Sequence, residues 1–453
     1  MKSTGLLIAA AVLAALTGTL YWSDHHKAAD TTAMPVDAAP KILTLKDSDL
    51  SKIEIKKKGA EEIALTKNDA GKWQITAPTP LAADQDAVSG MVSTLSSVNS
   101  ERVVEDKASD LKQYGLTDPA LEVDIALKDG KSQKLLLGDD TPAGNAVFAA
   151  ASGDPRVFTI ASYTKTSVDK SPNDLRDKRL LTADFDKISQ VELTSKKQSI
   201  DFGRNKDAWQ ILKPRPLRAD NFTVEDLVRR LKDAKMDLTA ATDTDEKKLA
   251  AAFASGTQIA TAKVTDAAGT QELQIRKDKD AYYAKSSAVS GIYKVANDLG
   301  TGLDKSLDDF RNKKLFDFAF DEPNKVELHD GSKAYFLTKG GQDWWSNGKK
   351  MDDATVQAFI DKVRDLSASK LVDSGFTTPV IDLTVSSKDG KRTEKVLISK
   401  SGDNYIAKRE NEPSLYQLDA KPVEDLQKSA ADVKPAPEPT PAAAGKTAPA
   451  TKK

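Results

Sequence analysis

The chain has 453 residues, enough for two to four domains, with 67 Lys and Arg against 68 Asp and Glu. Because the two signs are interspersed without a basic surplus or stripe, the composition argues against nucleic-acid binding. The absence of cysteine excludes disulfides, thiolate nucleophiles, cysteine-ligated zinc, iron–sulfur clusters and a lipid-modified N-terminal cysteine.

The first 24 residues predict an N-terminal membrane anchor. Residues 3–23 carry no charge, and a bilayer crossing needs about 20 apolar residues in a helix. Tyr21 and Trp22 end the run, where aromatic rings favour the headgroup layer. A cleaved signal peptide is the alternative, although the run is longer than a usual signal core. Either interpretation places everything after Asp24, including a linker at residues 25–40, outside the cytoplasm.

One segment of the chain occurs twice with nearly the same sequence and a third time with a more diverged sequence. KWQITAPTPLAAD at 72–84 and AWQILKPRPLRAD at 208–220 are nearly the same, and the third copy carries Trp344 and Trp345. A predicted helix follows each copy, with apolar residues at i, i+3, i+4 and i+7 on one face. These residues are Val88, Met91, Val92 and Leu95, then Val224, Leu227, Val228 and Leu231, then Val356, Phe359, Ile360 and Val363.

The residues that recur around each helix predict structural roles. An aspartate stands four residues before each apolar stripe, where its carboxylate can accept backbone N–H groups and oppose the helix dipole. A tryptophan on a strand beside a helix is more often part of a core than a platform for sugars. We therefore predict helix caps at Asp84, Asp220 and Asp352 and core positions at Trp73, Trp209 and Trp345.

Short alternating runs and an Asp-Gly hairpin signal predict several strands around each helix. Because strands follow one another with few helices between them, the predicted class is α+β with mostly antiparallel sheets. We expect three tandem modules with one main helix each, at residues 41–184, 185–318 and 319–430. Residues 431–453 are rich in Pro and Ala and predict a disordered tail.

A further motif closes the first two copies. DLRDKRLL at 174–181 recurs as DFRNKKLF at 309–316, and the third copy has no such sequence. We therefore predict that this segment docks one module onto the next. Arg176 and Arg311 stand at matching places, and an arginine can donate to acceptors on both sides of a junction. An exposed turn in which the arginine contributes little is the alternative.

Patterns that suggest a metal site are weak. His25 and His26 lie in the predicted linker, and His329 precedes a probable turn without a second histidine nearby. Asp243, Asp245 and Glu246 alternate like a calcium loop but lack its glycine and distal glutamate, which favours a solvated loop.

The sequence also contains one pattern that resembles a catalytic motif, and the second copy does not keep it. Ser167 and Lys170 have the Ser-x-x-Lys spacing of some acyl enzymes, but the second copy has Gly302 in place of the serine. The sequence therefore assigns no catalytic, cofactor-binding or metal-binding residue, and it predicts no cofactor.

The repeated motifs resemble a known bacterial family. The tryptophan segment with P-x-P-L-x-A-D, the G-L-x-D-P before a hairpin and the closing L-R-D-K-R-L are similar to those of domain of unknown function 4340 (DUF4340). The resemblance is clear over residues 41–316 and continues to about residue 430, where the third copy lacks P-x-P and the closing motif. It implies one N-terminal membrane helix and genes often placed beside ABC transporter subunits of the gliding-motility type. It assigns no catalytic residue.

These observations predict a non-enzymatic, membrane-anchored accessory or scaffold protein outside the cytoplasm. The expected location is the inner membrane, with a single pass and the bulk of the chain in the periplasm or another extracytoplasmic space. ABC transporter permease subunits are the expected partners, and the oligomeric state stays open. The alternative is a protein that binds a glycan of the envelope or cell wall through exposed faces of the modules.

Overall fold

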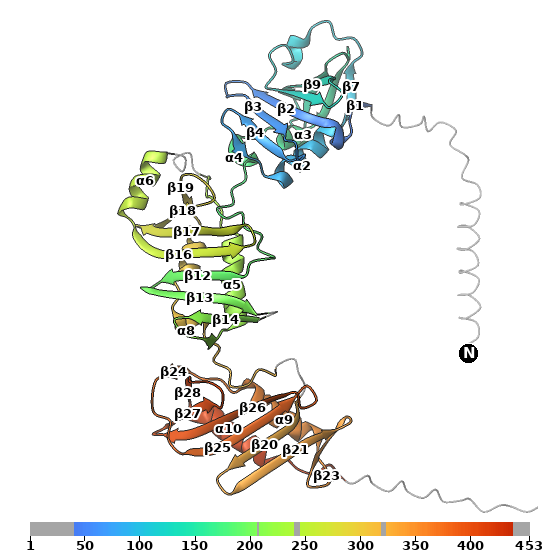
Figure 1. Ribbon diagram of the computed structural model, residues 1–453. Helices are drawn as coiled ribbons and strands as arrows, with labels where there is room; N and C mark the ends of the chain where they lie inside the picture. The colour runs from blue at the N-terminus through green and yellow to red at the C-terminus, as the bar shows by residue number, and fades with distance from the viewer. Residues whose placement is uncertain (1–39, 206–207, 240–244, 319–322, 438–453) are drawn as a thin grey trace, which may run out of the picture. The chain divides into compact units, whose positions relative to one another are not determined.

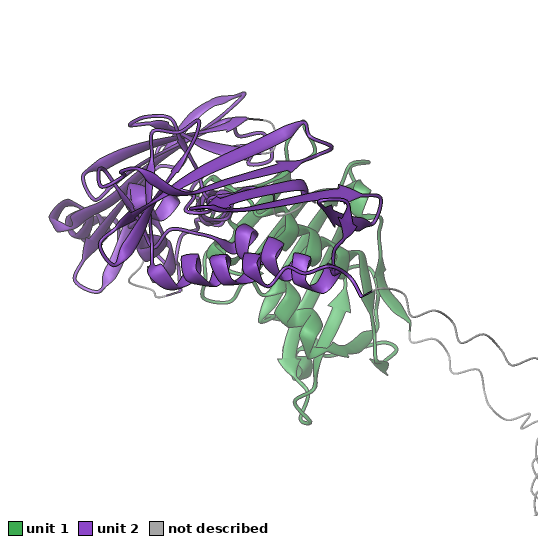
Figure 2. Cartoon of the chain, turned by 90° about the horizontal axis from the view of Figure 1, so that it is seen from below, with its two compact units in different colours: residues 1–178 green, residues 179–453 purple. Residues whose placement is uncertain are grey.

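The computed structural model describes residues 40–205, 208–239, 245–318 and 323–437 (Figure 1). The chain divides into two compact units, residues 1–178 and residues 179–453 (Figure 2). The predicted membrane anchor at residues 1–24 lies outside the described residues. Within the described ranges, no helix combines the length and apolar character that a membrane crossing requires.

The first unit is built on a sheet with the strand order β5-β4-β3-β2-β8-β9-β10-β11-β7, in which every neighbouring pair is antiparallel. A separate two-stranded sheet pairs β1 with β6. The strands are β1 Lys41–Thr44, β2 Leu50–Lys57, β3 Ile63–Lys67, β4 Trp73–Ala77, β5 Leu81–Ala82, β6 Ser97–Asn99, β7 Arg102–Glu105, β8 Leu121–Leu127, β9 Ser132–Asp140, β10 Ala146–Ala151 and β11 Val157–Ala161. The helices are α2 Gln85–Ser96, α3 Ser162–Val168 and α4 Pro172–Leu175, and the 3-10 turns are η1 Asp47–Asp49 and η2 Leu111–Tyr114.

The second unit begins with a sheet of the same plan, in the order β15-β14-β13-β12-β16-β17-β18-β19. The first and third large sheets each have one more strand beyond the strand equivalent to β19. In the second sheet, α6 packs against β17, β18 and β19 instead. The elements are β12 Gln190–Ser195, β13 Gln198–Asn205, β14 Ala208–Lys213, β15 Leu217–Arg218, α5 Asn221–Lys232, α6 Glu246–Ser255, β16 Thr257–Asp266, β17 Gly269–Asp278, β18 Ala281–Ser286, β19 Ile292–Val295, α7 Asn297–Leu303 and α8 Leu307–Phe310.

A third sheet completes the second unit, in the order β23-β22-β21-β20-β25-β26-β27-β28-β24. Its two helices, α9 and α10, pack against each other and bury apolar stripes in the same core. The elements are β20 Pro323–Asp330, β21 Lys333–Gly340, β22 Asp343–Ser346, β23 Lys349–Lys350, α9 Asp353–Asp365, β24 Lys370–Val372, β25 Pro379–Ser387, β26 Arg392–Ser401, β27 Asn404–Arg409, β28 Leu415–Leu418 and α10 Ala420–Ala431.

Each of the three large sheets has its own hydrophobic core, formed between one face of the sheet and its main helix. The predicted apolar stripes of α2, α5 and α9 are buried at all four positions, because residues at this spacing share one side of a helix. The predicted class, α+β with mostly antiparallel sheets, is confirmed. We call the three sheets with their helices repeats 1, 2 and 3.

Candidate functional site

The predicted cap aspartates lie at the starts of the three main helices. Asp84 accepts hydrogen bonds from the backbone N–H groups of Asp86 (3.0 Å) and Ala87 (3.1 Å). Asp220 accepts from the N–H of Thr223 at 2.8 Å, and Asp352 from that of Thr355 at 3.0 Å. These carboxylates are therefore engaged with groups that the first helical turn cannot satisfy internally.

Two of the three predicted core tryptophans are buried, and the prediction for Trp345 is wrong. Trp73 and Trp209 are 5% and 2% exposed, but Trp345 is 41% exposed and its neighbour Trp344 is buried. Side chains alternate between the two faces of a strand, so only one residue of the Trp344–Trp345 pair can enter the core.

Strand register identifies Trp344 as the equivalent residue. A cation lies over each buried tryptophan, and in every repeat it comes from the residue paired with that tryptophan on the adjacent strand. The pairs are Lys67 over Trp73 (4.8 Å), Arg204 over Trp209 (5.6 Å) and Lys339 over Trp344 (6.0 Å).

The closing motif after repeat 1 contributes to both units. Leu175 is buried in the core of repeat 1, and the N–H of Asp177 donates to the carbonyl of Ala82 at 2.8 Å. Three residues later, the N–H of Leu180 donates to the carbonyl of Ala234 at 2.9 Å, and Leu180 belongs to the core of repeat 2. We call such a segment a joint.

The joint after repeat 2 follows the same main-chain plan. Phe310 is buried in the core of repeat 2, and the N–H of Asn312 donates to the carbonyl of Arg218 at 3.0 Å. The N–H of Leu315 then donates to the carbonyl of Leu366 at 3.0 Å, and Leu315 is buried in the core of repeat 3.

Repeat 3 also has a closing segment, which its sequence does not reveal. The carbonyl of Lys434 accepts from the N–H of Asp352 at 2.9 Å, and the N–H of Ala436 donates to the carbonyl of Lys350 at 2.9 Å. Pro435 takes the place that Arg176 and Arg311 hold in the other repeats. Backbone hydrogen bonds form this short strand, so its side chains need not match.

The two predicted junction arginines occupy matching places in their own repeats. Arg176 is half-buried and pairs through its backbone with Ala83. Arg311 is 10% exposed; one nitrogen of its guanidinium lies 3.4 Å from the carboxylate of Asp308, and another donates to the hydroxyl of Ser414 at 3.1 Å. Arg311 therefore links repeat 2 to the strand connection before β28 of repeat 3.

A larger ionic cluster lies at the same joint and was not predicted. Arg218, at the end of β15, lies 2.6 Å from Asp317 and 2.7 Å from Glu412, and it also donates to the carbonyl of Lys314 and to the hydroxyl of Tyr416. Its side chain is only 20% exposed. Burial alone would lower the pKa of Arg218, but the nearby Asp317, Tyr416 and Glu412 outweigh this effect and raise it.

A second arginine completes this cluster from within repeat 3. Arg409 lies 2.9 Å from Glu394 and 2.8 Å from Glu412, and it donates to the carbonyl of Leu315. Glu394 in turn accepts from the N–H of Asp317 at 3.2 Å. We call Arg218, Asp317, Glu394, Arg409 and Glu412 the joint cluster. These side chains are mostly buried, and their ion pairs connect repeat 2 to repeat 3.

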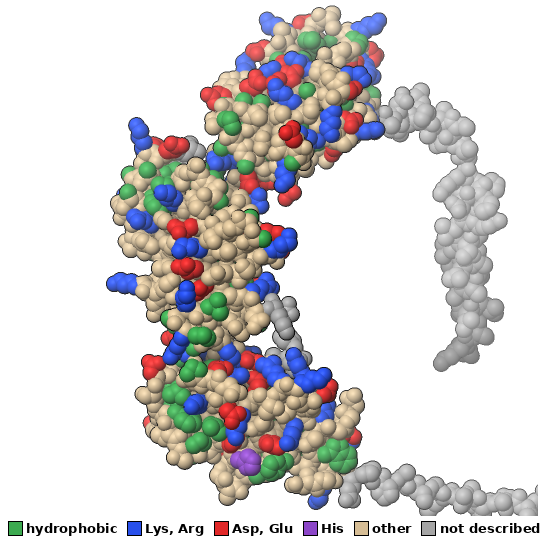
Figure 3. Space-filling model, in the orientation of Figure 1, with side chains coloured by type: hydrophobic (Ala, Val, Ile, Leu, Met, Phe, Trp, Pro, Cys, Tyr) green, Lys and Arg blue, Asp and Glu red, His purple; other side chains and the backbone are tan. Residues whose placement is uncertain are grey.

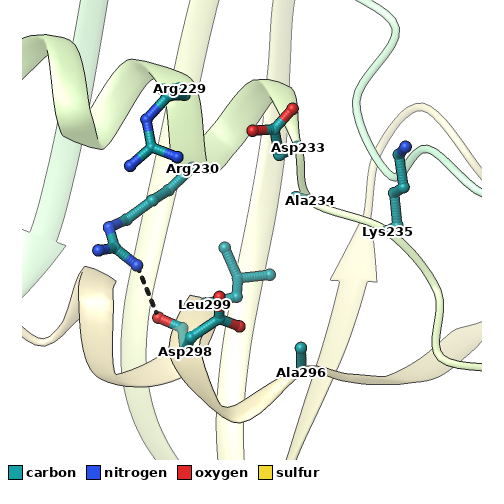
Figure 4. A pocket seen from close by; sticks show the side chains of 8 residues that line it. All are labelled: Arg229, Arg230, Asp233, Ala234, Lys235, Ala296, Asp298 and Leu299. Carbon is teal, nitrogen blue, oxygen red and sulfur yellow. Dashed lines mark hydrogen bonds between the residues drawn. The ribbon is translucent and has the colours of Figure 1, made fainter.

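The hollow drawn in Figure 4 lies between α5 and the start of α7 in repeat 2. It has a volume of about 200 Å³, and a neighbouring hollow of about 370 Å³ shares Asp233 and Lys235 with it. Arg230 donates to the carbonyl of Asp298 at 3.2 Å (Figure 4) and pairs with Asp226 at 2.7 Å. Arg229 pairs with Asp226 as well. Because these guanidinium groups are already engaged, the hollow does not assemble a distinct anion site.

The other sequence patterns have ordinary structural surroundings. Ser167 donates to the carbonyl of Tyr163 at 2.9 Å within α3, and its neighbour Asp169 pairs with Lys57 at 2.7 Å. Asp245 caps α6 through the N–H of Lys248 at 3.2 Å.

The remaining parts of these patterns are only partly described. Glu246 is the first residue of α6, whereas Asp243, His25 and His26 lie outside the described residues. Across the described ranges, no three His, Asp or Glu side chains converge in a way that could hold a metal ion.

Comparison with known proteins identifies the family. The model of the domain of unknown function DUF4340 matches residues 73–251 and again residues 209–380. The chain belongs to the DUF4340 family. Both matches begin at a buried tryptophan, Trp73 or Trp209, and run through a joint into the next repeat. No curated protein and no solved structure matches the chain.

Proposed function

We propose that this DUF4340 protein is a non-enzymatic accessory or scaffold protein of an ABC-type transport system. In this proposal, residues 1–24 anchor the chain in the inner membrane, and the three repeats lie on the extracytoplasmic side. The association with permease subunits rests on the family resemblance, and the anchoring rests on the uncharged run at residues 3–23.

The observation that supports a scaffold is the kind of residue that recurs between repeats. Matching positions hold helix caps, buried tryptophans and joint segments, all of which serve folding and the connection of one repeat to the next. The joint cluster adds ion pairs where repeats 2 and 3 meet. A protein whose recurring residues serve its own architecture is suited to a scaffold role.

Capture from membranes tests the association. The tagged full chain should enrich permease and ATPase subunits of an ABC transporter from detergent-solubilised membranes after crosslinking. The matched control is residues 1–40 fused to an unrelated soluble domain, which keeps the anchor and removes the repeats. Equal recovery of transporter subunits with both proteins, or no recovery with the full chain, would overturn the proposal.

Protease treatment of intact spheroplasts tests the location. The repeats should be degraded by added protease while a cytoplasmic marker survives, because the charge-free anchor delivers them to the outer side of the membrane. Full protection of the repeats until the membrane is lysed contradicts an extracytoplasmic location.

A second candidate function is glycan binding. The observation that favours it is a group of exposed aromatic rings on the sheet of repeat 3, to which Trp345 belongs.

A further inference from the structure

Repeat 3 carries a line of rings on the open face of its sheet. Trp345 on β22 pairs with Thr338 on β21, and Phe336 lies two residues before Thr338 on the same face. Phe336 pairs with Glu327 on β20, and its ring centroid lies 5.4 Å from that of His329, two residues further along. Each ring is thus a diagonal neighbour of the next, at a spacing that aromatic side chains can bridge. We call Trp345, Phe336 and His329 the ring strip.

The ring strip is exposed, and its largest member lies beside a glycine. Trp345 and Phe336 are each 41% exposed, and the histidine of this repeat (purple) lies beside hydrophobic side chains in Figure 3. A Cβ atom at Gly340 would come within 3.2 Å of the Trp345 ring. The indole therefore lies close to the backbone of Gly340, where a larger residue would press against it.

The other two repeats provide an internal comparison, because strand register fixes the equivalent positions. Repeat 1 has Gln74, Ala64 and Lys56 at the three places, and repeat 2 has Gln210, Asp201 and Thr194. The fold therefore does not require rings on this face. Three aromatic side chains at neighbouring positions of one repeat are a feature that the stability of the shared plan does not explain.

The charges around the ring strip favour an uncharged ligand. Lys325 pairs with Glu327, Lys395 lies 2.8 Å from Asp382, and Lys350 lies 2.8 Å from Asp343. Because these neighbouring cations and carboxylates satisfy one another, the face presents little net charge to steer a nucleic acid or an anionic lipid surface.

The hydrogen bonding of the sheet argues against an added peptide strand on this face. The backbone N–H and C=O groups of β20, β21 and β22 are used in the ladders with their neighbours. A ligand here must therefore rely on ring faces and polar side chains, such as the Thr338 hydroxyl and the Glu327 carboxylate. A sugar chain fits this requirement, since its C–H faces pack on the electron-rich faces of aromatic rings and its hydroxyls reach side chains at the rim.

We propose that the ring strip binds a neutral oligosaccharide, with Trp345 and Phe336 stacking on successive sugar rings. This inference rests on the second candidate function, glycan binding, and it is independent of any association with a transporter.

Titration of the full chain with N,N′,N″,N‴-tetraacetylchitotetraose, followed by tryptophan fluorescence and calorimetry, tests the proposal. Trp345→Gln, which installs the residue of repeats 1 and 2, should weaken binding by about tenfold or more, as expected for loss of a central aromatic anchor. Phe336→Ala, the residue of repeat 1, should weaken it as well. Phe222→Gln is the matched control, because Phe222 is 83% exposed on α5, away from the ring strip, and binding should be unchanged.

The outcomes separate the site from the function. Binding by the parent that Trp345→Gln leaves unchanged would overturn the ring strip as the site while glycan binding stands. No binding of the oligosaccharide by the parent would overturn both. Binding of an oligoproline peptide in place of the sugar, with the same loss in Trp345→Gln, would identify the ring strip as a peptide site and contradict a sugar ligand. Circular dichroism of each variant checks that the fold is kept.

Discussion

The two joints share one main-chain plan but differ in their side chains. In the joint after repeat 1, Ser286 donates to the carbonyl of Leu180, and the N–H of Thr182 donates to Gln271 at 2.8 Å. In the joint after repeat 2, Arg409 donates to the carbonyl of Leu315, and the N–H of Asp317 donates to Glu394. Strand register makes these pairs of contacts equivalent.

The difference is one of charge. Where the joint cluster has Arg218, Asp317, Glu394, Arg409 and Glu412, the matching residues of the first joint are Ala82, Thr182, Gln271, Ser286 and Val289. The hydrogen-bond frame therefore does not depend on charge. The charged residues add contacts between repeats 2 and 3, because Arg218 of repeat 2 contacts Asp317, Glu412 and Tyr416.

The largest expected effect tests what the joints have in common. Leu175→Ala and Leu180→Ala should each cost about 3 kcal/mol of stability, because both side chains are fully buried and leave cavities. Hydrogen exchange measured by mass spectrometry should localise the first loss to residues 41–178 and the second to residues 179–318. Faster exchange in the same region for both variants would show that the chain does not cross between cores at this point.

Removal of the arginine that distinguishes the second joint should have the next largest effect. Arg218→Ala should cost about 2 kcal/mol, somewhat below the loss typical of a fully buried ion pair, since Arg218 retains some exposure. Repeats 2 and 3 should then unfold in two separate steps during denaturant titration of the full chain.

The control for Arg218→Ala is the matching residue of repeat 3. Lys350→Ala breaks only a pair with Asp343, in which the two side chains are 46% and 38% exposed, so a change within about 0.5 kcal/mol is expected. Equal losses of stability in the two variants would mean that the ion pairs of the joint cluster add no stability beyond that of an exposed pair.

The smallest expected effect concerns a feature that both joints keep. Ser171 with Asp174 and Ser306 with Asp309 form capping boxes at the starts of α4 and α8. Hydrogen bonds from Ser306 hold the pKa of Asp309 below its usual value, and those from Ser171 do the same for the pKa of Asp174.

A folded-state pKa below the unfolded value of about 3.9 means that the carboxylate stabilises the fold above that pH. The contribution is lost as the pH falls through the folded pKa. Asp309→Ala and Asp174→Ala should therefore each lose about 0.5 kcal/mol at pH 6, because the carboxylates are exposed and screened, and the loss should fade toward pH 2. A loss that grows on acidification would contradict this role.

The sequence by itself determined the repeats and most of their local structure. Helix stripes, cap aspartates and alternating strands depend on spacing along a few residues, and this spacing is visible without a fold. The tryptophan of repeat 3 was placed wrongly because two adjacent tryptophans cannot be assigned to faces until strand pairing gives Trp344 the partner Lys339.

Only the tertiary structure decided how the repeats are connected. The contacts of Arg218 with Asp317 and Tyr416 span 99 and 198 positions, and no local pattern reports such distances. The closing strand at Pro435 forms through backbone groups, which every sequence supplies. The ring strip likewise joins three strands whose register sets which side chains meet. Short-range spacing fixed the elements, whereas the pairing of distant strands determined which residues became neighbours.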